Sequence, residues 1–472
     1  MQIAITKYFR SSYLYAGLLL GLIIGLLFEY LVFVAAGLIC LFVLKELNRK
    51  FLLPFSIFLL LSFGSDVGES VRDIMNMFSL GLIIFLVFEF KQDLTYRIKL
   101  IPRGIIYLVI TVIASMFLSS AFSVYPATGF SELTRQVVFF FLCFLIFLLY
   151  DPDNDLNIFI YAVILSGFAV SITTIYSFLS SPEDISQLLL QAYVKEGGIF
   201  KNITATGGLL MVSTGLTIVN LVVKKRSNSA IPFGDIGILA VQIIGFLLTN
   251  SRAAFMGLTF TAMLMFFIFN RKFFYKVTVA LISLLAGLTV FSETFSDTIF
   301  NFLRLGRVLE NTRYIIWDML FRMIQDNPVL GIGPGETKYF LNKYINVMWG
   351  SWDAEQLLYN FEKGGLGQAH NFYLFRWVEL GIVGLATAVL LPALYLFYTS
   401  KIRKWLRQTD PKQWILFTGL MCVGIGIFFR AFFEATGILS HGWISRDLPF
   451  WILMIIVMAE YSALKNKEEI KI

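Results

Sequence analysis

The sequence predicts an all-α polytopic membrane protein. Of its 472 residues, 58% are hydrophobic and only 15% are charged, and the mean hydropathy is +0.77. A soluble domain carries about 25% charged residues. A water-soluble protein could not bury this much apolar surface, which excludes soluble enzymes, disordered proteins and coiled coils. Most of the chain is therefore expected to lie in lipid.

Fourteen apolar segments approach the length of about 20 residues that a helix needs to cross a bilayer. The second and third are short and could form one broken or tilted element, so we expect about 12–14 transmembrane helices. The segments are 11–28, 30–44, 51–64, 75–90, 103–122, 134–150, 157–179, 203–223, 233–249, 252–270, 273–291, 371–400, 413–432 and 448–464.

Basic residues in the short loops predict the orientation, because cytoplasmic loops are enriched in Lys and Arg. The count of fourteen spans puts all of these basic groups on one side, where only the 151–156 turn lacks a basic residue, and both termini are then inside. The net charge of +7 is then a topology signal, and no nucleic-acid partner is expected. The first apolar run is expected to be a signal anchor. The basic groups are Lys7 and Arg10; Lys45, Arg49 and Lys50; Lys91, Arg97, Lys99 and Arg103; Lys224, Lys225 and Arg226; Arg271, Lys272 and Lys276; Lys401, Arg403, Lys404 and Arg407; Lys465 and Lys467.

The longest segment outside the predicted spans is 292–370, on the side opposite the basic loops. It contains amphipathic, helix-like sequence followed by a glycine- and proline-rich break. A loop of this length in a compact protein is usually functional. We therefore divide the chain into transmembrane helices over 1–291, a periplasmic loop domain over 292–370, and C-terminal transmembrane helices over 371–472.

Two arginines on the loop-domain side are candidate anion-binding residues. Arg252 lies where an apolar span begins, and an arginine there is costly unless it snorkels or binds something. Arg313 follows Arg304 and Arg307, although a lone arginine on a helix is usually just exposed. The guanidinium fork matches phosphate oxygens two at a time, so a diphosphate would suit such a group.

His370, at the start of the 371–400 span, is the candidate general base. Histidine has an unperturbed pKa suited to base catalysis near neutrality, although a lone histidine is more often structural. The only other histidine is His441, and neither has a third ligand at a recognisable spacing, so no metal site and no cofactor are expected. The cysteines Cys40, Cys143 and Cys422 lie in apolar runs and are expected to be buried and unpaired.

Several further polar residues on this side are candidate substrate contacts. The glycine-rich segment before the 203–223 span would allow close approach of backbone to a ligand, or could simply lead into a helix cap. Glu434 could orient Arg430, bind sugar or form a plain ion pair with it. The candidate contacts are Lys201, Asn202, Tyr314, Asn371, Arg430, Glu434 and His441.

Over residues 198–390 the chain resembles the O-antigen ligase and O-antigen polymerase superfamily of bacterial inner membranes. The matching elements come in the family's order, and a long loop separates the arginine motif from the histidine motif. They are Gly198-Ile-Phe-Lys-Asn202, Ser251-Arg252, Arg313 with Trp317, Asn327-Pro-Val-Leu-Gly-Ile-Gly-Pro-Gly335, Ala369-His-Asn-Phe-Tyr-Leu374 and Glu379-Leu-Gly-Ile-Val-Gly384.

The resemblance implies a GT-C-like, metal-independent glycosyltransferase that works at the periplasmic face. Its donor would be a glycan on undecaprenyl diphosphate, and its acceptor a glycan or lipid A-core. It implies Arg252 and Arg313 as diphosphate binders and His370 as the base. A single displacement at the donor sugar would invert the configuration at C1.

Three activities are compatible with these motifs. Surface-polysaccharide polymerase is the leading interpretation, and O-antigen ligase is the alternative; none of the residues named separates them. A transporter of lipid-linked sugar is a distant third. A transporter would be expected to carry ionisable residues in mid-span and paired broken helices, whereas these spans look apolar and the polar residues gather at one face.

Overall fold

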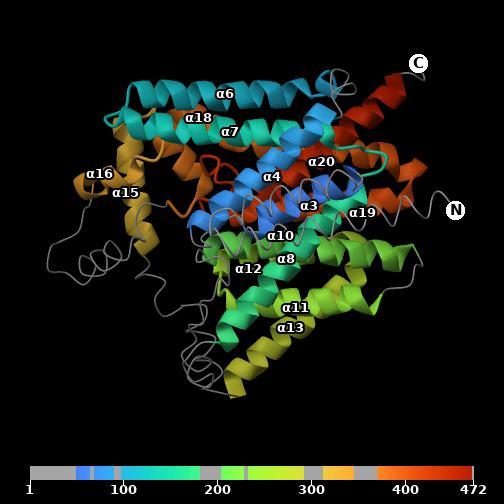
Figure 1. Ribbon diagram of the computed structural model, residues 1–472. Coiled ribbons are helices and arrows are strands. Elements are labelled where there is room, and N and C mark those ends of the chain that lie inside the picture. Colours follow the sequence, from blue (N-terminus) through green and yellow to red (C-terminus); the bar gives the residue numbers. More distant parts are fainter. Residues whose placement is uncertain are drawn as a thin grey trace, which may run out of the picture.

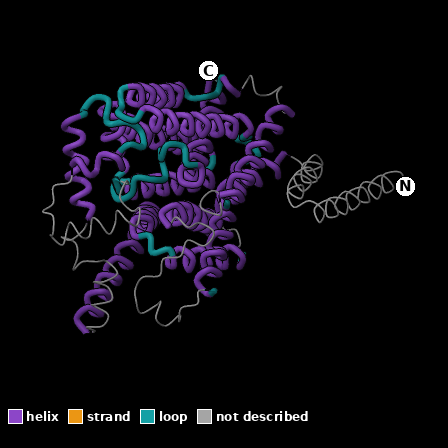
Figure 2. The backbone as a smooth tube through the Cα atoms, turned by 60° about the vertical axis from the view of Figure 1, so that its left-hand side comes forward, coloured by secondary structure: helices purple, strands orange, loops and turns teal. Residues whose placement is uncertain are grey.

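The computed structural model describes residues 49–63, 69–89, 97–180, 203–227, 232–291, 312–344 and 369–469. Throughout these ranges the chain forms helices joined by turns, without a strand, as Figure 2 shows. The predicted all-α class is therefore confirmed. The predicted spans 11–28 and 30–44 lie outside the described residues.

Each of the other twelve predicted spans corresponds to a helix. Eight helices within the described ranges are long and apolar enough to cross a membrane, namely α6 (Arg103–Ala121), α7 (Pro126–Leu149), α8 (Leu156–Leu179), α10 (Ile203–Arg226), α12 (Arg252–Phe269), α18 (Phe372–Thr409), α19 (Pro411–Arg430) and α20 (Ile444–Glu469). Shorter apolar stretches lie in α3 (Arg49–Ser62), α4 (Glu69–Glu89), α11 (Phe233–Leu248) and α13 (Arg271–Phe291). The chain is thus a multi-pass membrane protein.

Two amphipathic helices from the predicted loop domain complete the described structure, α15 (Thr312–Asp326) and α16 (Thr337–Tyr344). In Figure 1 they stand at the left, by the left-hand ends of α6 and α7. One apolar side of α15 is buried in a small cluster of its own that includes Met319, Leu320 and Met323. α15 packs on α18, so this part of the loop domain is seated on the membrane bundle.

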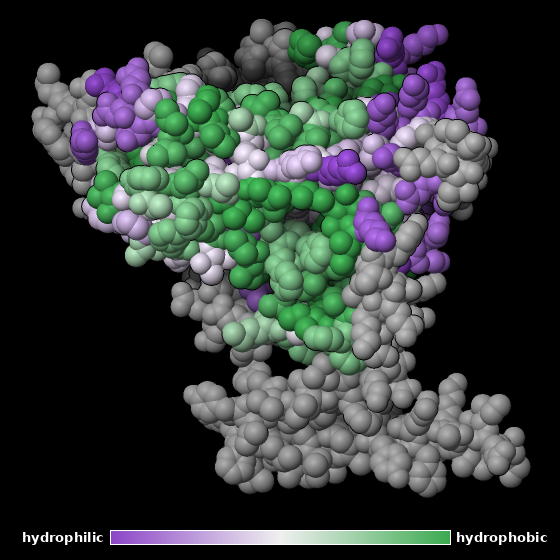
Figure 3. Space-filling view, turned by 90° about the horizontal axis from the view of Figure 1, so that it is seen from above, coloured by the Kyte–Doolittle hydropathy of each residue, from purple (hydrophilic) through white to green (hydrophobic). Residues whose placement is uncertain are grey.

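The core of the bundle is a single apolar cluster centred on α20. All residues from Leu448 to Ala459 are buried, and so are the polar residues Ser445 and Asp447 in the first turn of the helix. α19 packs on both α12 and α18, and α10 packs on α8, α12 and α19. Figure 3 shows one outer face, where hydrophobic residues fill the middle and hydrophilic groups gather at its two ends.

The two ends of the bundle differ in composition. Most of the basic residues of the loops lie at one end. Hydrogen bonds join the loops there: Arg97 donates to the Leu148 carbonyl at 3.3 Å, and Ser462 donates to the Leu100 carbonyl at 2.6 Å. We call this end of the bundle the basic end. It is formed by residues 97–103, 148–155, 224–227, 269–276, 401–412 and 460–467. The opposite site end is formed by residues 119–125, 250–252, 327–337, 369–381 and 430–447.

Candidate active site

A glycine-rich turn from the loop domain is docked on the first part of α18 through main-chain atoms. The amide of Ile332 donates to the carbonyl of Val378 at 2.9 Å, and the amide of Gly333 donates to the carbonyl of Glu379 at 3.1 Å. In an unbroken α-helix the Val378 carbonyl would accept from Ile382, four residues later. The loop thus takes over a hydrogen bond that the helix gives up.

The helix gives up this bond because it is kinked at Gly381, which has φ +63° and ψ −157°. Only glycine adopts this backbone region without strain. A Cβ atom on Gly381 would lie 2.0 Å from the Val329 carbonyl oxygen, and one on Gly331 would lie 2.3 Å from the Glu379 carbonyl carbon. The two backbones can touch only because both residues are glycines.

His370 lies in the turn that leads into α18, with a left-handed backbone at φ +44°. Two contacts hold this turn. The Trp317 indole donates to the carbonyl of Ala369 at 2.9 Å, and the amide of Phe372 donates to the carbonyl of Ala431 at 2.8 Å. The histidine is therefore fixed from both sides, by α15 and by the end of α19.

The imidazole of His370 faces a buried carboxylate. Its Nδ1 lies 3.7 Å from Oε2 of Glu434, the side chains being 27% and 5% exposed. A carboxylate beside one ring nitrogen orients an imidazole and stabilises the imidazolium that forms when the other nitrogen takes a proton. This pair, 64 positions apart in sequence, is the arrangement at the site end best suited to general-base chemistry.

Arg430 joins α10 to the loop after α19. Its buried guanidinium donates to the carbonyl of Thr436 at 2.7 Å and to that of Thr204 at 3.2 Å. A Cβ on Gly208 would lie 3.4 Å from its Nη2. These contacts give Arg430 a structural role in holding the site end together, and substrate contact by this residue stays a prediction.

The start of α12, where Arg252 is the first residue, packs against the same first turns of α10. A Cβ on Gly207 would lie 2.5 Å from the Cβ of Ser251. Arg252 itself is half-exposed. Because Gly207 and Gly208 are adjacent, α10 brings the Arg252 helix start and the Arg430 guanidinium to one region of the site end.

Arg313 and Tyr314 lie in the first turn of α15, one turn before Trp317, which reaches the residue next to His370. The structure describes only the backbone of these two residues. Lys201 and Asn202 also lie outside the described residues. The structure therefore brings the backbone of Arg313 near the histidine turn and leaves the roles of these four residues as predictions.

Asn371 and His441 have contacts within the protein. The Asn371 side chain accepts from the amide of Leu374 at 3.0 Å, which makes it the N-cap of α18. His441 is buried, with Nε2 2.6 Å from Oε2 of Glu379 and its ring 5.1 Å from that of Phe375. The two histidines thus lie beside different carboxylates, His370 beside Glu434 and His441 beside Glu379.

The site end also holds a group of buried charged residues that are not among the predicted contacts. Glu379 accepts from Thr337 of α16 at 2.9 Å as well as meeting His441. Arg376 and Asp447 are both fully buried. Their position in predicted spans could have marked them in the sequence, since ionisable residues inside membrane spans are rare and usually functional. The spans are thus less uniformly apolar than expected, but these charges lie within the first turns at the site end.

Glu336, in the turn before α16, is buried beneath the loop. Its Oε2 accepts from the amide of Tyr125 at 3.2 Å, which ties the loop to the start of α7. Burial raises the pKa of the Glu336 carboxyl above its usual value, partly offset by hydrogen bonds from Ser123 and Tyr125.

The fold and site together define a multi-pass membrane protein with a polar site at one end of its bundle. Residues 237–389 match the family model described as O-antigen ligase. This match covers about a third of the chain and agrees with the predicted resemblance to the O-antigen ligase and polymerase superfamily. No curated protein matches the chain.

The matched region includes the three residues for which the motifs predict chemistry, Arg252, Arg313 and His370. Glu434, the partner of His370, lies beyond it. The match supports a glycosyltransferase-like function of the ligase or polymerase type, with a lipid-linked glycan donor in a membrane setting.

Proposed function

We propose that the protein transfers a glycan from undecaprenyl diphosphate to an acceptor sugar hydroxyl at the periplasmic face of the bacterial inner membrane, as a surface-polysaccharide polymerase. The observation that carries the proposal is the His370–Glu434 pair, 3.7 Å apart, at the end of the bundle where α12 begins with Arg252. The basic end would then face the cytoplasm, in keeping with the positive-inside rule.

The reaction would be a single displacement. The acceptor hydroxyl oxygen attacks C1 of the donor sugar as His370 takes the hydroxyl proton, and the C1–O bond to the diphosphate breaks with the electron pair leaving on oxygen. Arg252 and Arg313 would stabilise the charge that develops on the diphosphate, so that no metal ion is needed. Attack opposite the leaving group inverts the configuration at C1.

Purified protein incubated with a lipid-linked repeat unit alone tests the polymerase assignment. A ladder of longer lipid-linked products supports a polymerase. Products that form only after lipid A-core is added would instead support the ligase alternative. Transport of the repeat unit across proteoliposomes without any bond formation would contradict both.

Alanine variants test the roles of individual residues. We expect His370→Ala to lower the transfer rate by roughly 10²- to 10⁴-fold, the usual contribution of a general base. Arg252→Ala and Arg313→Ala should lower it strongly as well. The matched controls are Arg322→Ala, an exposed residue of α15 paired with Asp318, and Arg271→Ala at the basic end. Full activity in His370→Ala would remove the base assignment.

A further inference from the structure

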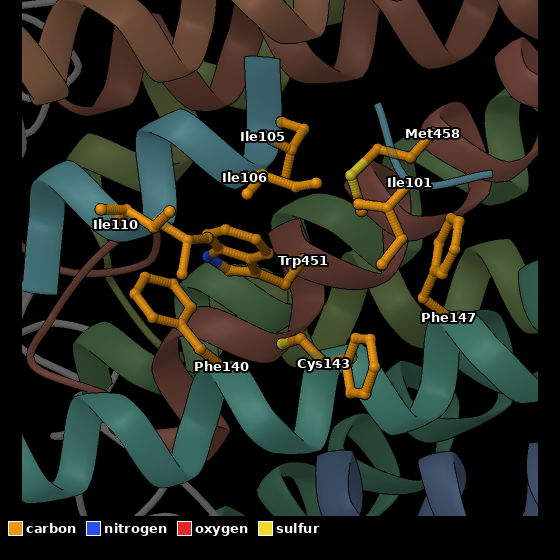
Figure 4. A pocket seen from close by; sticks show the side chains of 11 residues that line it. Ile101, Ile105, Ile106, Ile110, Phe140, Cys143, Phe147, Trp451 and Met458 are labelled. Carbon is orange, nitrogen blue, oxygen red and sulfur yellow. The ribbon is translucent and has the colours of Figure 1, made fainter. Parts of the chain in front are cut away.

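An apolar pocket lies between α6, α7 and α20. It has a volume of about 320 Å³, within the range of ligand-binding pockets. Its lining is almost wholly apolar and is formed by isoleucine, valine, phenylalanine, methionine, cysteine and tryptophan side chains. In Figure 4 the Trp451 indole stands in the centre, with side chains of α6 above it and side chains of α7 below it.

The pocket has a buried floor and a mouth that opens sideways to lipid. Trp451 is 2% exposed and Cys143 is 4% exposed, whereas Ile106 is 40% and Ile110 57% exposed. The indole N–H of Trp451 already donates to the carbonyl of Ile438 at 2.8 Å, so the indole presents only its apolar ring to the pocket. The occupant must therefore be hydrocarbon.

On α6 and α7 the pocket lining lies in the half of the helix near the basic end. Its α6 side runs from Ile101 to Ile110, which is roughly 13 Å along a helix axis. The hydrocarbon core of a bilayer is about 30 Å thick, so the pocket fits a chain from one leaflet. A lipid entering here has its head group at the basic end, on the opposite side from His370.

Positive charge borders the basic end of the pocket. Exposed Lys99 and Arg103 flank the lining residue Ile101, and they form no ion pair within the described ranges. Arg97 donates to the main-chain carbonyl of Tyr150, three residues after the lining residue Phe147. Basic pockets between transmembrane helices bind anionic lipid head groups.

Two of the nearby acidic side chains are engaged within the protein. Asp153 pairs with Lys467 at 3.1 Å, and Glu460 accepts from the Tyr150 hydroxyl at 3.0 Å. We propose that this pocket is a binding site for an anionic phospholipid of the basic-end leaflet, with an acyl chain between α6, α7 and α20 and its phosphate near Lys99 and Arg103. The site is separate from the transfer reaction and does not depend on it.

Photolabelling of the full-length protein in nanodiscs tests the proposal. The probe is phosphatidylglycerol with a photoactivatable group in its acyl chain, and peptide mass spectrometry maps the labelled positions. We expect labelling concentrated on the pocket segments of α6, α7 and α20. Ile106→Trp, which fills the mouth, should abolish it, and Ile172→Trp, at an exposed position of α8 outside the pocket, should leave it unchanged.

The head-group assignment is tested by charge variants and competitors. Lys99→Gln with Arg103→Gln should weaken labelling roughly tenfold, while Arg271→Gln with Lys272→Gln, also exposed at the basic end, should not. Equal competition by phosphatidylethanolamine would overturn the role of charge. Stronger competition by undecaprenyl phosphate would replace the phospholipid with a polyprenyl chain. Labelling spread evenly over α8, α12 and α13 would mean general lipid contact and overturn the site.

Discussion

At the scale of single residues, the backbone of His370 is the most informative feature of the site end. A positive φ is uncommon for a residue other than glycine and persists only where surrounding contacts impose it. Here the Trp317 indole and the main chain of Ala431 impose it. The histidine is thereby held near Glu434, in an orientation that a free turn would not maintain.

Glu434→Gln should therefore impair transfer without disturbing the fold. The amide keeps the shape of the side chain but cannot stabilise an imidazolium, so we expect the turnover rate to fall roughly 10- to 100-fold with little change in the Michaelis constant. Steady-state kinetics on a lipid-linked repeat would measure this. A rise in the Michaelis constant alone would instead indicate that Glu434 binds sugar.

The raised pKa of Glu336 gives a pH dependence with a definite sign. The folded protein holds this proton more tightly than the unfolded chain, so stability falls as pH rises from about 4.5 through the folded-state pKa. Thermal unfolding from pH 4.5 to 7.5 should show this slope, and Glu336→Gln should remove part of it. An unchanged slope in the variant would show that Glu336 is not its source.

Some of the candidate residues stand out in the sequence, whereas their partners do not. His370, Arg252 and Arg313 stand out because a histidine or arginine beside an apolar run is unusual in itself. The pairing of His370 with Glu434, and of His441 with Glu379, joins residues more than 60 positions apart. No local pattern encodes such a contact, since it arises only when α18, α19 and their loops pack together.

At the scale of helices and loops, the exchange of main-chain hydrogen bonds between residues 327–335 and α18 links the loop domain to the membrane bundle. The glycines of residues 327–335 predict a turn from the sequence alone. The docking itself was not predictable, because it is made by backbone atoms and because the apolar run through 371–400 continues across the kink at Gly381. Hydrophobic length predicts a span, but not where its helix is broken.

Gly381→Ala should loosen this docking. The new methyl group meets the Val329 carbonyl and the backbone region is strained for alanine, so we expect a loss of about 3 kcal/mol in stability together with loss of transfer. Gly237→Ala in α11, where a Cβ meets nothing within 4 Å, is the matched control and should be neutral or slightly stabilising. Thermal unfolding in detergent would compare them, and equal behaviour of both variants would contradict the role of the kink.

At the scale of the whole molecule, the twelve described helices that correspond to predicted spans were predictable because bilayer thickness sets a length that sequence alone reveals. The segregation of basic loops to one end follows from the same alternation. The lateral pocket was not predictable, because its walls come from three helices whose apolar residues would serve equally well as ordinary lipid contacts.

The proposed orientation predicts which positions are reachable from outside the cell. In a variant without Cys40, the remaining Cys143 and Cys422 are buried. Lys338→Cys, exposed in α16, should react with a membrane-impermeant maleimide in cells with a permeabilised outer membrane. Lys412→Cys, exposed at the basic end, should react only after the inner membrane is opened. The reverse pattern would invert the topology.

The bond from Trp317 to Ala369 closes a stretch of 52 residues into a loop whose two ends meet beside the histidine. Such a stretch can be exchanged as a cassette, since its entry and exit points are fixed to each other and to α18. Chimaeras that replace residues 345–368 with those of another superfamily member, and keep Trp317, the docked residues 327–344 and Ala369, should change which acceptor reaches His370 while the imidazole itself stays where it is.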